Sequence, residues 1–171
     1  MDHAAFDDVP NDAYDDLHAD RRMLTEALSA DGLALARYEL APGDRLSGAV
    51  HAHTRQEEVF VVLAGAVTFE VGRDADGAEP VAITEDGAVR FAPGEFQSGY
   101  VPADADERAV VLALGAPREP GETRVSRIPV LDHNVSCPDC GRGDLRFARE
   151  GDDTDDDLVC PDCGGSTTPD Q

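Results

Sequence analysis

Two histidines and a glutamate form the group of residues with the clearest chemical meaning in this chain. His51 and His53 are two residues apart, so on a β-strand both side chains point to the same face. Glu58 follows after a short polar stretch that can turn its carboxylate back toward the imidazoles. Two imidazoles and one carboxylate bind divalent metals such as Fe, Mn, Ni or Zn and leave coordination positions open. The spacing therefore predicts a divalent metal site formed by His51, His53 and Glu58.

Four cysteines near the C-terminus form a second candidate metal site. Cys137 and Cys140 belong to a Cys-Pro-Asp-Cys-Gly pentapeptide, and Cys160 and Cys163 belong to an identical one. Each pair places two thiolates on one tight turn, and four thiolates satisfy tetrahedral zinc at Zn–S distances of about 2.3 Å. The pattern resembles a zinc ribbon over residues 135–168. A rubredoxin-type iron site is the rival interpretation, and the scarcity of aromatic residues between the pairs favours zinc.

The elements that must position the histidines are short β-strands. Runs of β-prone residues recur along the chain and are separated by Gly, Pro and Asp. Strands at this spacing predict an all-β sandwich or barrel, with an exposed hairpin tip at residues 73–77. The expected strands cover residues 33–40, 46–52, 58–63, 67–71, 81–84, 88–91, 96–101 and 108–114.

The histidine motif and its surroundings resemble the cupin superfamily. The first motif of that family is matched by His51-x-His53, four residues, Glu58, six residues and Gly65, and the resemblance extends over residues 33–114. It implies a double-stranded β-helix, which is a small jelly-roll barrel, with a metal in the barrel mouth. It also implies a capacity to form a homodimer.

The second motif of the family is kept except at the position of its ligand. The frame that begins at Gly87 continues with five residues and Pro-Gly, but Gln97 stands where a fourth ligand, a histidine, is expected. A glutamine oxygen is a weaker ligand than a neutral imidazole, although it can coordinate a metal or hold a bound water. Three interpretations follow: a metal centre, a metal-poor barrel that binds an organic ligand, or histidines satisfied by Glu58 and Gln97. Tyr100 is a candidate for lining the ligand pocket.

Composition divides the chain into four segments. Residues 1–22 are rich in Asp and are expected to form a flexible, acidic arm, with a helical turn around residues 19–28. The barrel is expected over residues 23–116. Residues 117–134 begin with the prolines, glycine and charges of a linker, and the ribbon follows over residues 135–168.

The charge of the chain is extreme. There are 36 acidic and 14 basic residues, and all the basic ones are Arg, which gives a net charge of −22. Such a chain repels itself in dilute buffer and resembles proteins of extreme halophiles, in which molar salt screens the repulsion. The same charge argues against unaided binding to nucleic acid or an anionic membrane. The acidic N-terminus and the lack of a long apolar run lead us to expect a cytoplasmic protein without a membrane span.

Two function classes remain open from the sequence. In the first, the barrel binds a divalent metal, a small polar metabolite or both, and the ribbon is structural or docks a protein partner. In the second, the barrel is a metal-dependent dioxygenase or isomerase that acts on a small metabolite. Gln97 is the residue that separates the two classes, because it decides how completely a metal is held.

Overall fold

The computed structural model describes residues 1–14, 17–73, 80–149, 151–152, 154 and 156–169, so most of the expected hairpin tip at 73–77 lies outside the described residues. Within these residues, helical structure is confined to short pieces: the 3₁₀ turns η1 (Phe6–Asp8) and η2 (Pro129–Leu131), and the single turn α1 (Leu24–Ala27). Among the described residues, no helix combines the length and apolar character needed to cross a membrane. The remaining elements are strands, as the sequence predicts.

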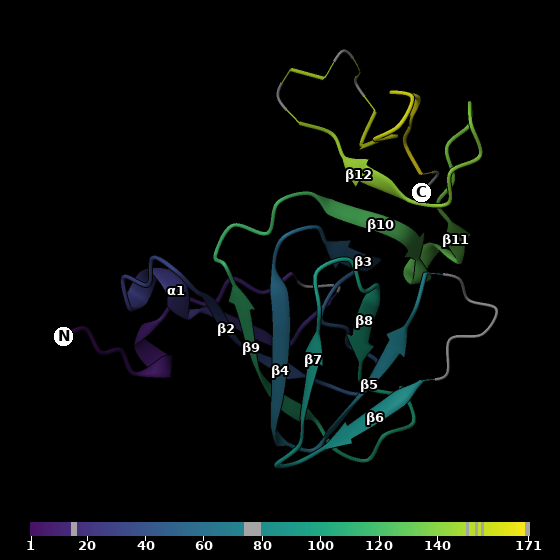
Figure 1. The fold of residues 1–171 in the computed structure, drawn as a ribbon. Coiled ribbons are helices and arrows are strands. Elements are labelled where there is room, and N and C mark those ends of the chain that lie inside the picture. Colours follow the sequence, from purple (N-terminus) through teal and green to yellow (C-terminus); the bar gives the residue numbers. More distant parts are fainter. Residues whose placement is uncertain (15–16, 74–79, 150, 153, 155, 170–171) are drawn as a thin grey trace.

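Two antiparallel sheets face each other and form a barrel (Figure 1). The first sheet contains β1 (Asp20–Met23), β2 (Ala34–Leu40), β4 (Glu57–Ala64), β7 (Ala88–Phe91) and β9 (Ala109–Ala116), in the order β1-β2-β9-β4-β7. The second contains β3 (Val50–His53), β5 (Ala66–Val71), β6 (Val81–Thr84), β8 (Gln97–Tyr100), β10 (Thr123–Ile128), β11 (His133–Asn134), β12 (Leu145–Phe147), β13 (Leu158–Val159) and β14 (Ser166–Thr167). Its order is β14-β13-β12-β10-β3-β8-β5-β6, and β11 pairs with β10.

The barrel core is formed by alternate residues of the two facing sheets. Phe60, Phe69 and Phe91 lie at its centre with ring centroids 5.2–6.1 Å apart and interplanar angles between 46° and 66°. Rings in this arrangement attract one another through edge and face as well as filling space. Burial of alternate residues is the pattern expected of strands with one face in the core, so the hydrophobic periodicity explains why these segments form sheets.

A tight turn at Gly65 connects β4 to β5. Its φ is +70°, a conformation that glycine adopts without steric cost, and a Cβ built there would lie 2.4 Å from the carbonyl oxygen of Arg108. A side chain at this position would clash with the backbone, so the turn requires the glycine that follows Glu58 after six intervening residues.

The N-terminal segment contains more structure than its acidic composition suggests. Residues 20–23 form β1 and pair with β2, although the sequence predicts a flexible arm up to residue 22. The guanidinium of Arg21 lies 5.2 Å from the ring centre of Tyr14 and 6.0 Å from that of Tyr38. These contacts stabilise β1, which has few apolar residues. A pattern of hydrophobic residues alone therefore does not predict this strand.

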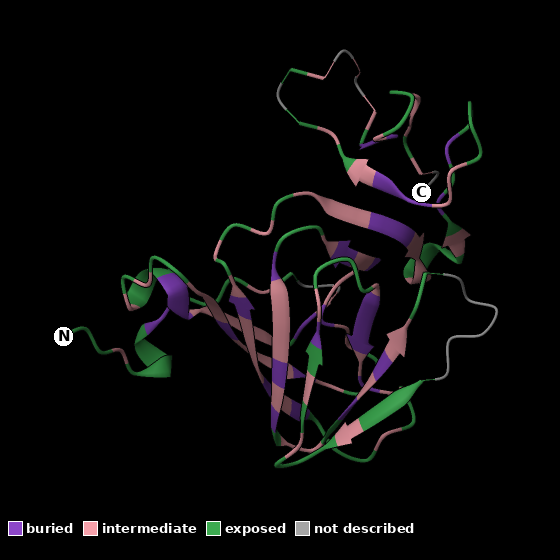
Figure 2. Ribbon diagram, viewed as in Figure 1, coloured by how far each residue is buried: buried purple, intermediate pink, exposed green. Residues whose placement is uncertain are grey.

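Strand β10 lies inside residues 117–134, where the sequence predicts a linker. It pairs with β3 of the barrel on one side and with β12 of the ribbon on the other, so one sheet runs from barrel to ribbon. Figure 2 shows buried stretches in β10 and β12 where the two meet. Val125 and Leu145 are paired there and lie in a core cluster that also includes the ribbon residues Cys137 and Leu158.

Candidate metal centres and the cavity between barrel and ribbon

The side chains of His51, His53 and Glu58 converge in the barrel mouth. One ligand atom from each lies within 4.8 Å of the others, and Nε2 of His53 is 3.5 Å from Oε1 of Glu58. The two imidazole rings are 5.0 Å apart and inclined at 66°. Donor atoms about 2.0–2.2 Å from one ion are separated by roughly 3–4 Å, so small side-chain adjustments let all three bind the same metal. The donor set therefore fits a divalent ion.

The two sheets contribute different ligands to this site. β3 supplies both histidines, which alternate with the buried Val50 and Ala52, and β4 of the other sheet supplies Glu58 at its second residue. Figure 1 shows β3 and the start of β4 at the end of the barrel that carries the ribbon. The site thus depends on the barrel being closed, because neither sheet holds the whole ligand set.

Each histidine is oriented through its other ring nitrogen. Nδ1 of His51 lies 3.1 Å from the carbonyl oxygen of Ala49 and 3.2 Å from Oγ of Ser47. Because a carbonyl only accepts, Nδ1 carries the proton and Nε2 is left free to bind a metal. Nδ1 of His53 lies 3.1 Å from Oγ1 of Thr123 on β10. Such outer contacts fix the tautomer and the ring angle of metal-binding histidines.

Gln97 contacts the carboxylate of the site. It is 2% exposed, stands opposite His51 in the β3–β8 pair, and its amide nitrogen donates a hydrogen bond to Oε2 of Glu58 at 3.0 Å. The structure therefore places Gln97 as a partner of Glu58, whose other oxygen faces His53. This contact orients Glu58 and accounts for the burial of a polar side chain.

Burial and charge set the protonation states that a metal site requires. Desolvation is the main cause that holds the pKa of His51 below its usual value, against an opposing effect of the Glu58 charge. Burial acts to raise the pKa of Glu58, but the hydrogen bond and charge of His53 help to outweigh it, so the pKa lies below its usual value. At neutral pH the His51 imidazole is neutral and the carboxylate is ionised, and both forms are those that bind a metal.

The four cysteines form a second cluster. The Sγ atoms of Cys137 and Cys163 are 3.5 Å apart, those of Cys140 and Cys160 are 3.6 Å apart, and all four are free thiols within 4.8 Å of one another. Four sulfurs at about 2.3 Å from a tetrahedral ion are separated by about 3.8 Å, so the cluster fits zinc. Backbone N–H groups, that of Cys140 above all, lower the pKa of Cys137 to about 7, which favours the thiolate that a metal binds.

The two cysteine turns have the same backbone geometry. In each, the glycine N–H donates a 3.0 Å hydrogen bond to the carbonyl oxygen of the first cysteine: Gly141 to Cys137 and Gly164 to Cys160. Both glycines have φ values above +70°, in the left-handed region. The repeated pentapeptide thus forms a repeated structure, two knuckles that face each other.

A cavity of about 780 Å³ adjoins the barrel mouth. The barrel, the turn η2 and the ribbon all contribute walls, and the described lining residues are Leu17, Ser47, Gly48, Ala49, His51, His53, Thr123, Val125, Ile128, Val130, Leu131, Phe147, Ala148, Asp156, Asp157, Leu158 and Pro169. Tyr100 is not among these described lining residues. Its ring instead lies under the guanidinium of Arg45, 4.9 Å from it.

Sequence reasoning did not identify Thr123 or the ribbon residue Phe147 as parts of a site. Both lie far along the chain from the histidines, and neither belongs to a motif. The only signal was the β-prone alternation in residues 123–128, which follows a stretch of prolines and glycine that reads as a linker.

Comparison with known proteins defines the fold of the barrel. No protein-family model and no curated protein matches the chain. Among solved structures, the polyketide cyclase RemF from Streptomyces resistomycificus is similar with a TM-score of 0.59 and 19% identity, over 74% of this chain and 86% of that one. A protein with a double-stranded β-helix domain from Klebsiella pneumoniae has a TM-score of 0.55 and 14% identity, over 72% and 89%. The barrel is a double-stranded β-helix.

A third solved structure with a similar fold belongs to the cupin superfamily. The sugar phosphate isomerase of that superfamily from Silicibacter pomeroyi has a TM-score of 0.57 and 17% identity, over 85% of this chain and 86% of that one. At these identities the likeness shows the shared fold alone. The predicted all-β double-stranded β-helix is confirmed, and the four-cysteine cluster at its C-terminal end fits a zinc ribbon.

Proposed function

We propose that the barrel binds one divalent metal through His51, His53 and Glu58 and uses it to hold a small metabolite in the adjoining cavity. The convergence of the three ligand atoms within 4.8 Å supports this proposal most directly. The proton on Nδ1 of His51 leaves Nε2 free, and both histidines line the cavity. Three protein ligands leave coordination positions that a metabolite can occupy.

The metals that suit this ligand set are Fe(II), Mn(II), Ni(II) and Zn(II). In the ribbon, we propose zinc bound by four thiolates, because a closed tetrahedral set of sulfurs is the usual structural zinc site. Zinc supplies much of the folding free energy of so small a segment, whose own core is limited. The two centres are thus assigned different roles: the ribbon zinc is structural and the barrel metal binds a ligand.

The described lining of the cavity favours binding over catalysis. Apart from the two histidines, its ordinary acid–base groups are Asp156 and Asp157 on the ribbon side. The carboxylate of Asp156 accepts hydrogen bonds from the hydroxyls of Ser166 and Thr168, and the Ser166 bond is the main cause that keeps its pKa below the usual value. Such a carboxylate stays ionised at neutral pH and is a poor proton donor, so Asp156 does not suit the role of general acid.

Metal content measured on the full-length chain tests the proposal. After expression with supplemented metal, the wild type is expected to hold about two equivalents of metal, one in each centre. His53→Ala and Glu58→Gln each remove a ligand and should lower the total by about one equivalent while the zinc in the ribbon stays bound.

His133→Ala serves as the matched control, because this histidine on β11 belongs to neither ligand cluster and is not among the described lining residues, so its loss should leave the metal content unchanged. A wild type that holds only the metal of the cysteine cluster, under all four metals, would contradict a barrel metal site.

A further inference from the structure

One face of the second sheet runs from the barrel interior onto the ribbon. His51 stands opposite Val125 in the β3–β10 pair, and Val125 stands opposite Leu145 in the β10–β12 pair. Residues paired across two strands lie on the same face of a sheet, and so do residues two apart on one strand. Phe147 therefore lies on the same face as Leu145, and its partner Leu158 on β13 lies there too. The metal-binding face of the barrel therefore continues as an apolar face of the ribbon.

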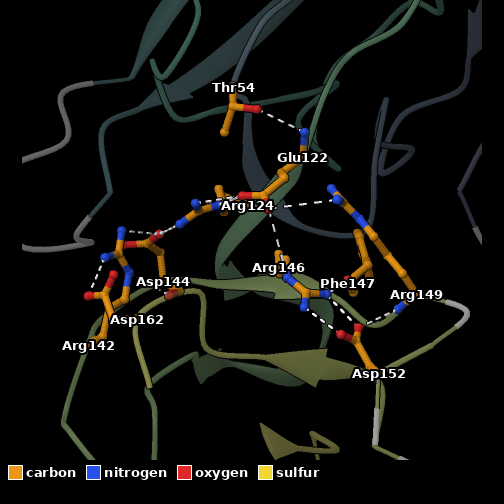
Figure 3. A network of polar contacts seen from close by, with 10 residues as sticks. All are labelled: Thr54, Glu122, Arg124, Arg142, Asp144, Arg146, Phe147, Arg149, Asp152 and Asp162. Carbon is orange, nitrogen blue, oxygen red and sulfur yellow. Dashed lines mark hydrogen bonds and ion pairs between the residues drawn. The ribbon is translucent and has the colours of Figure 1, made fainter. Parts of the chain in front are cut away.

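The opposite face of the same strands is charged and fixes the ribbon in place (Figure 3). Arg124 lies 2.6 Å from Glu122 and 3.3 Å from Asp144, and Arg146 lies 2.6 Å from Asp152. The ion pairs span β10, β12 and the loops of the ribbon. Because these polar contacts are confined to one face, the other face is left to apolar side chains that border the cavity.

Exposed apolar side chains gather around this cavity. Val130, Leu131 and Phe147 are 60%, 40% and 49% exposed, and all three line it. Such a cluster on a chain with a net charge of −22 is costly unless something covers it. The volume of about 780 Å³ falls in the range of cavities that enclose small organic ligands.

The charges at the cavity restrict what can fill it. The described lining residues include Asp156 and Asp157 but no arginine, and the chain has no lysine at all. A phosphate or carboxylate on the body of a ligand is normally met by arginine, lysine or a helix N-terminus. Here such a group would face carboxylates and apolar side chains.

We propose that the ribbon selects the ligand of the barrel, and that this ligand is a small chelating molecule with an uncharged, apolar body. The chelating head binds the barrel metal, so the inference rests on the function proposed above. The apolar body lies against the ribbon face that includes Phe147 and Leu158. The ribbon is then a wall of the binding site.

Three hydroxamates serve as probes, because a hydroxamate chelates divalent metals and its tail can be varied. The full-length chain loaded with Ni(II) is titrated by calorimetry with acetohydroxamate, hexanohydroxamate and the monohydroxamate of adipic acid, whose tail ends in a carboxylate. Hexanohydroxamate is expected to bind at least about tenfold tighter than acetohydroxamate, since its extra methylenes are buried. The probe that ends in a carboxylate should bind without this increase in affinity.

Phe147→Asp tests the role of the ribbon wall and should bring the hexanohydroxamate to acetohydroxamate affinity ratio close to one. Leu63→Asp is the matched control: Leu63 is 45% exposed, lies on β4 outside the described cavity lining, and should leave the ratio unchanged. Zinc content is measured on each variant to show that the ribbon is intact.

Equal affinities for acetohydroxamate and hexanohydroxamate, or an unchanged affinity ratio in Phe147→Asp, would contradict the proposal that the ribbon selects the ligand. Neither result would contradict the barrel metal site. Failure of acetohydroxamate itself to bind the Ni(II)-loaded chain would overturn the proposal that the barrel metal holds a ligand, and the inference with it. If Phe147→Asp instead turned a dimer into a monomer with no effect on the ratio, the apolar face would belong to a second copy of the chain.

Discussion

Burial sets the protonation state of some side chains in this protein, and His18 shows this outside the candidate metal site. It is 5% exposed, its Nδ1 accepts a hydrogen bond from the backbone N–H of Tyr14 at 3.1 Å, and its Nε2 lies 3.4 Å from the carbonyl oxygen of Leu46. Desolvation is the main cause that lowers the pKa of His18. The neutral ring holds the N-terminal segment beside Leu17, which lines the cavity.

The free energy of unfolding is therefore expected to fall as the pH drops from about 7 to about 5. In the unfolded chain His18 regains its ordinary pKa of 6.5, so the unfolded state takes up the proton first and is favoured below that pH. His18→Gln removes this contribution, and urea unfolding at a series of pH values should show a smaller slope.

His3→Gln is the control for this experiment, because His3 is exposed near the N-terminus and its loss should leave the slope as in the wild type. A His18→Gln chain with the full wild-type slope would assign the pH dependence to other groups.

At the scale of elements, β10 connects the two centres of the molecule. Its first residue, Thr123, contacts His53, and Val125 packs in the cluster that includes Cys137 and Cys160. The backbone N–H of Glu122 donates a 2.8 Å hydrogen bond to Oγ1 of Thr54, just after β3. The position of a barrel ligand and the packing of the ribbon thus depend on the same strand.

Asp144 is expected to be the carboxylate that matters most for this connection. It is 2% exposed and lies within 3.4 Å of Arg73, Arg124 and Arg142. Asp144→Asn leaves three guanidinium groups around a neutral side chain, and the free energy of unfolding should fall by at least about 2 kcal/mol in urea or thermal unfolding.

Asp162→Asn provides a matched comparison, because Asp162 also pairs with Arg142, at 2.6 Å, but its side chain is 61% exposed. An exposed pair contributes about 1 kcal/mol or less, so this variant should lose far less stability. Equal losses in the two variants would show that burial of Asp144 is unimportant.

The sequence predicts the barrel strands and brings out both clusters of candidate ligands because each is encoded locally. The strands alternate in hydrophobicity, the ligands lie in short motifs, and Gly65 marks a turn that only glycine can form. The cavity between barrel and ribbon could not be predicted in this way. Its walls join residues about a hundred positions apart, such as His51 and Leu158, and the joining strand β10 contains arginines whose charge is offset by acidic residues distant in sequence.

At the scale of the whole molecule, the acidic excess acts on the fold through repulsion. Thirteen of the 14 arginines, all except Arg55, lie within 4 Å of a described carboxylate, so most of the basic charge is already engaged. With 36 acidic residues against 14 basic ones, the carboxylates far outnumber the arginines that could neutralise them. Their mutual repulsion lowers the free energy of unfolding at low ionic strength.

Stability is therefore expected to rise with salt. Raising KCl from about 0.1 M to about 1 M shortens the Debye length from about 10 Å to about 3 Å. An increase of about 2 kcal/mol in the free energy of unfolding would raise Tm by roughly 4–8 °C for a chain of this size. Differential scanning calorimetry measures the shift, and an uncharged osmolyte at matched osmolality is the control. A Tm that is the same at both salt concentrations would contradict this account.

The sharing of β10 also determines what happens if the chain is shortened. β10 covers one side of β3, so a chain cut before Thr123 would leave the N–H and C=O groups of β3 unpaired at an open sheet edge. Open edges invite strand addition by another molecule, which leads to domain swapping or aggregation. The segment that joins the ribbon to the barrel thus also protects the barrel from association with its own copies.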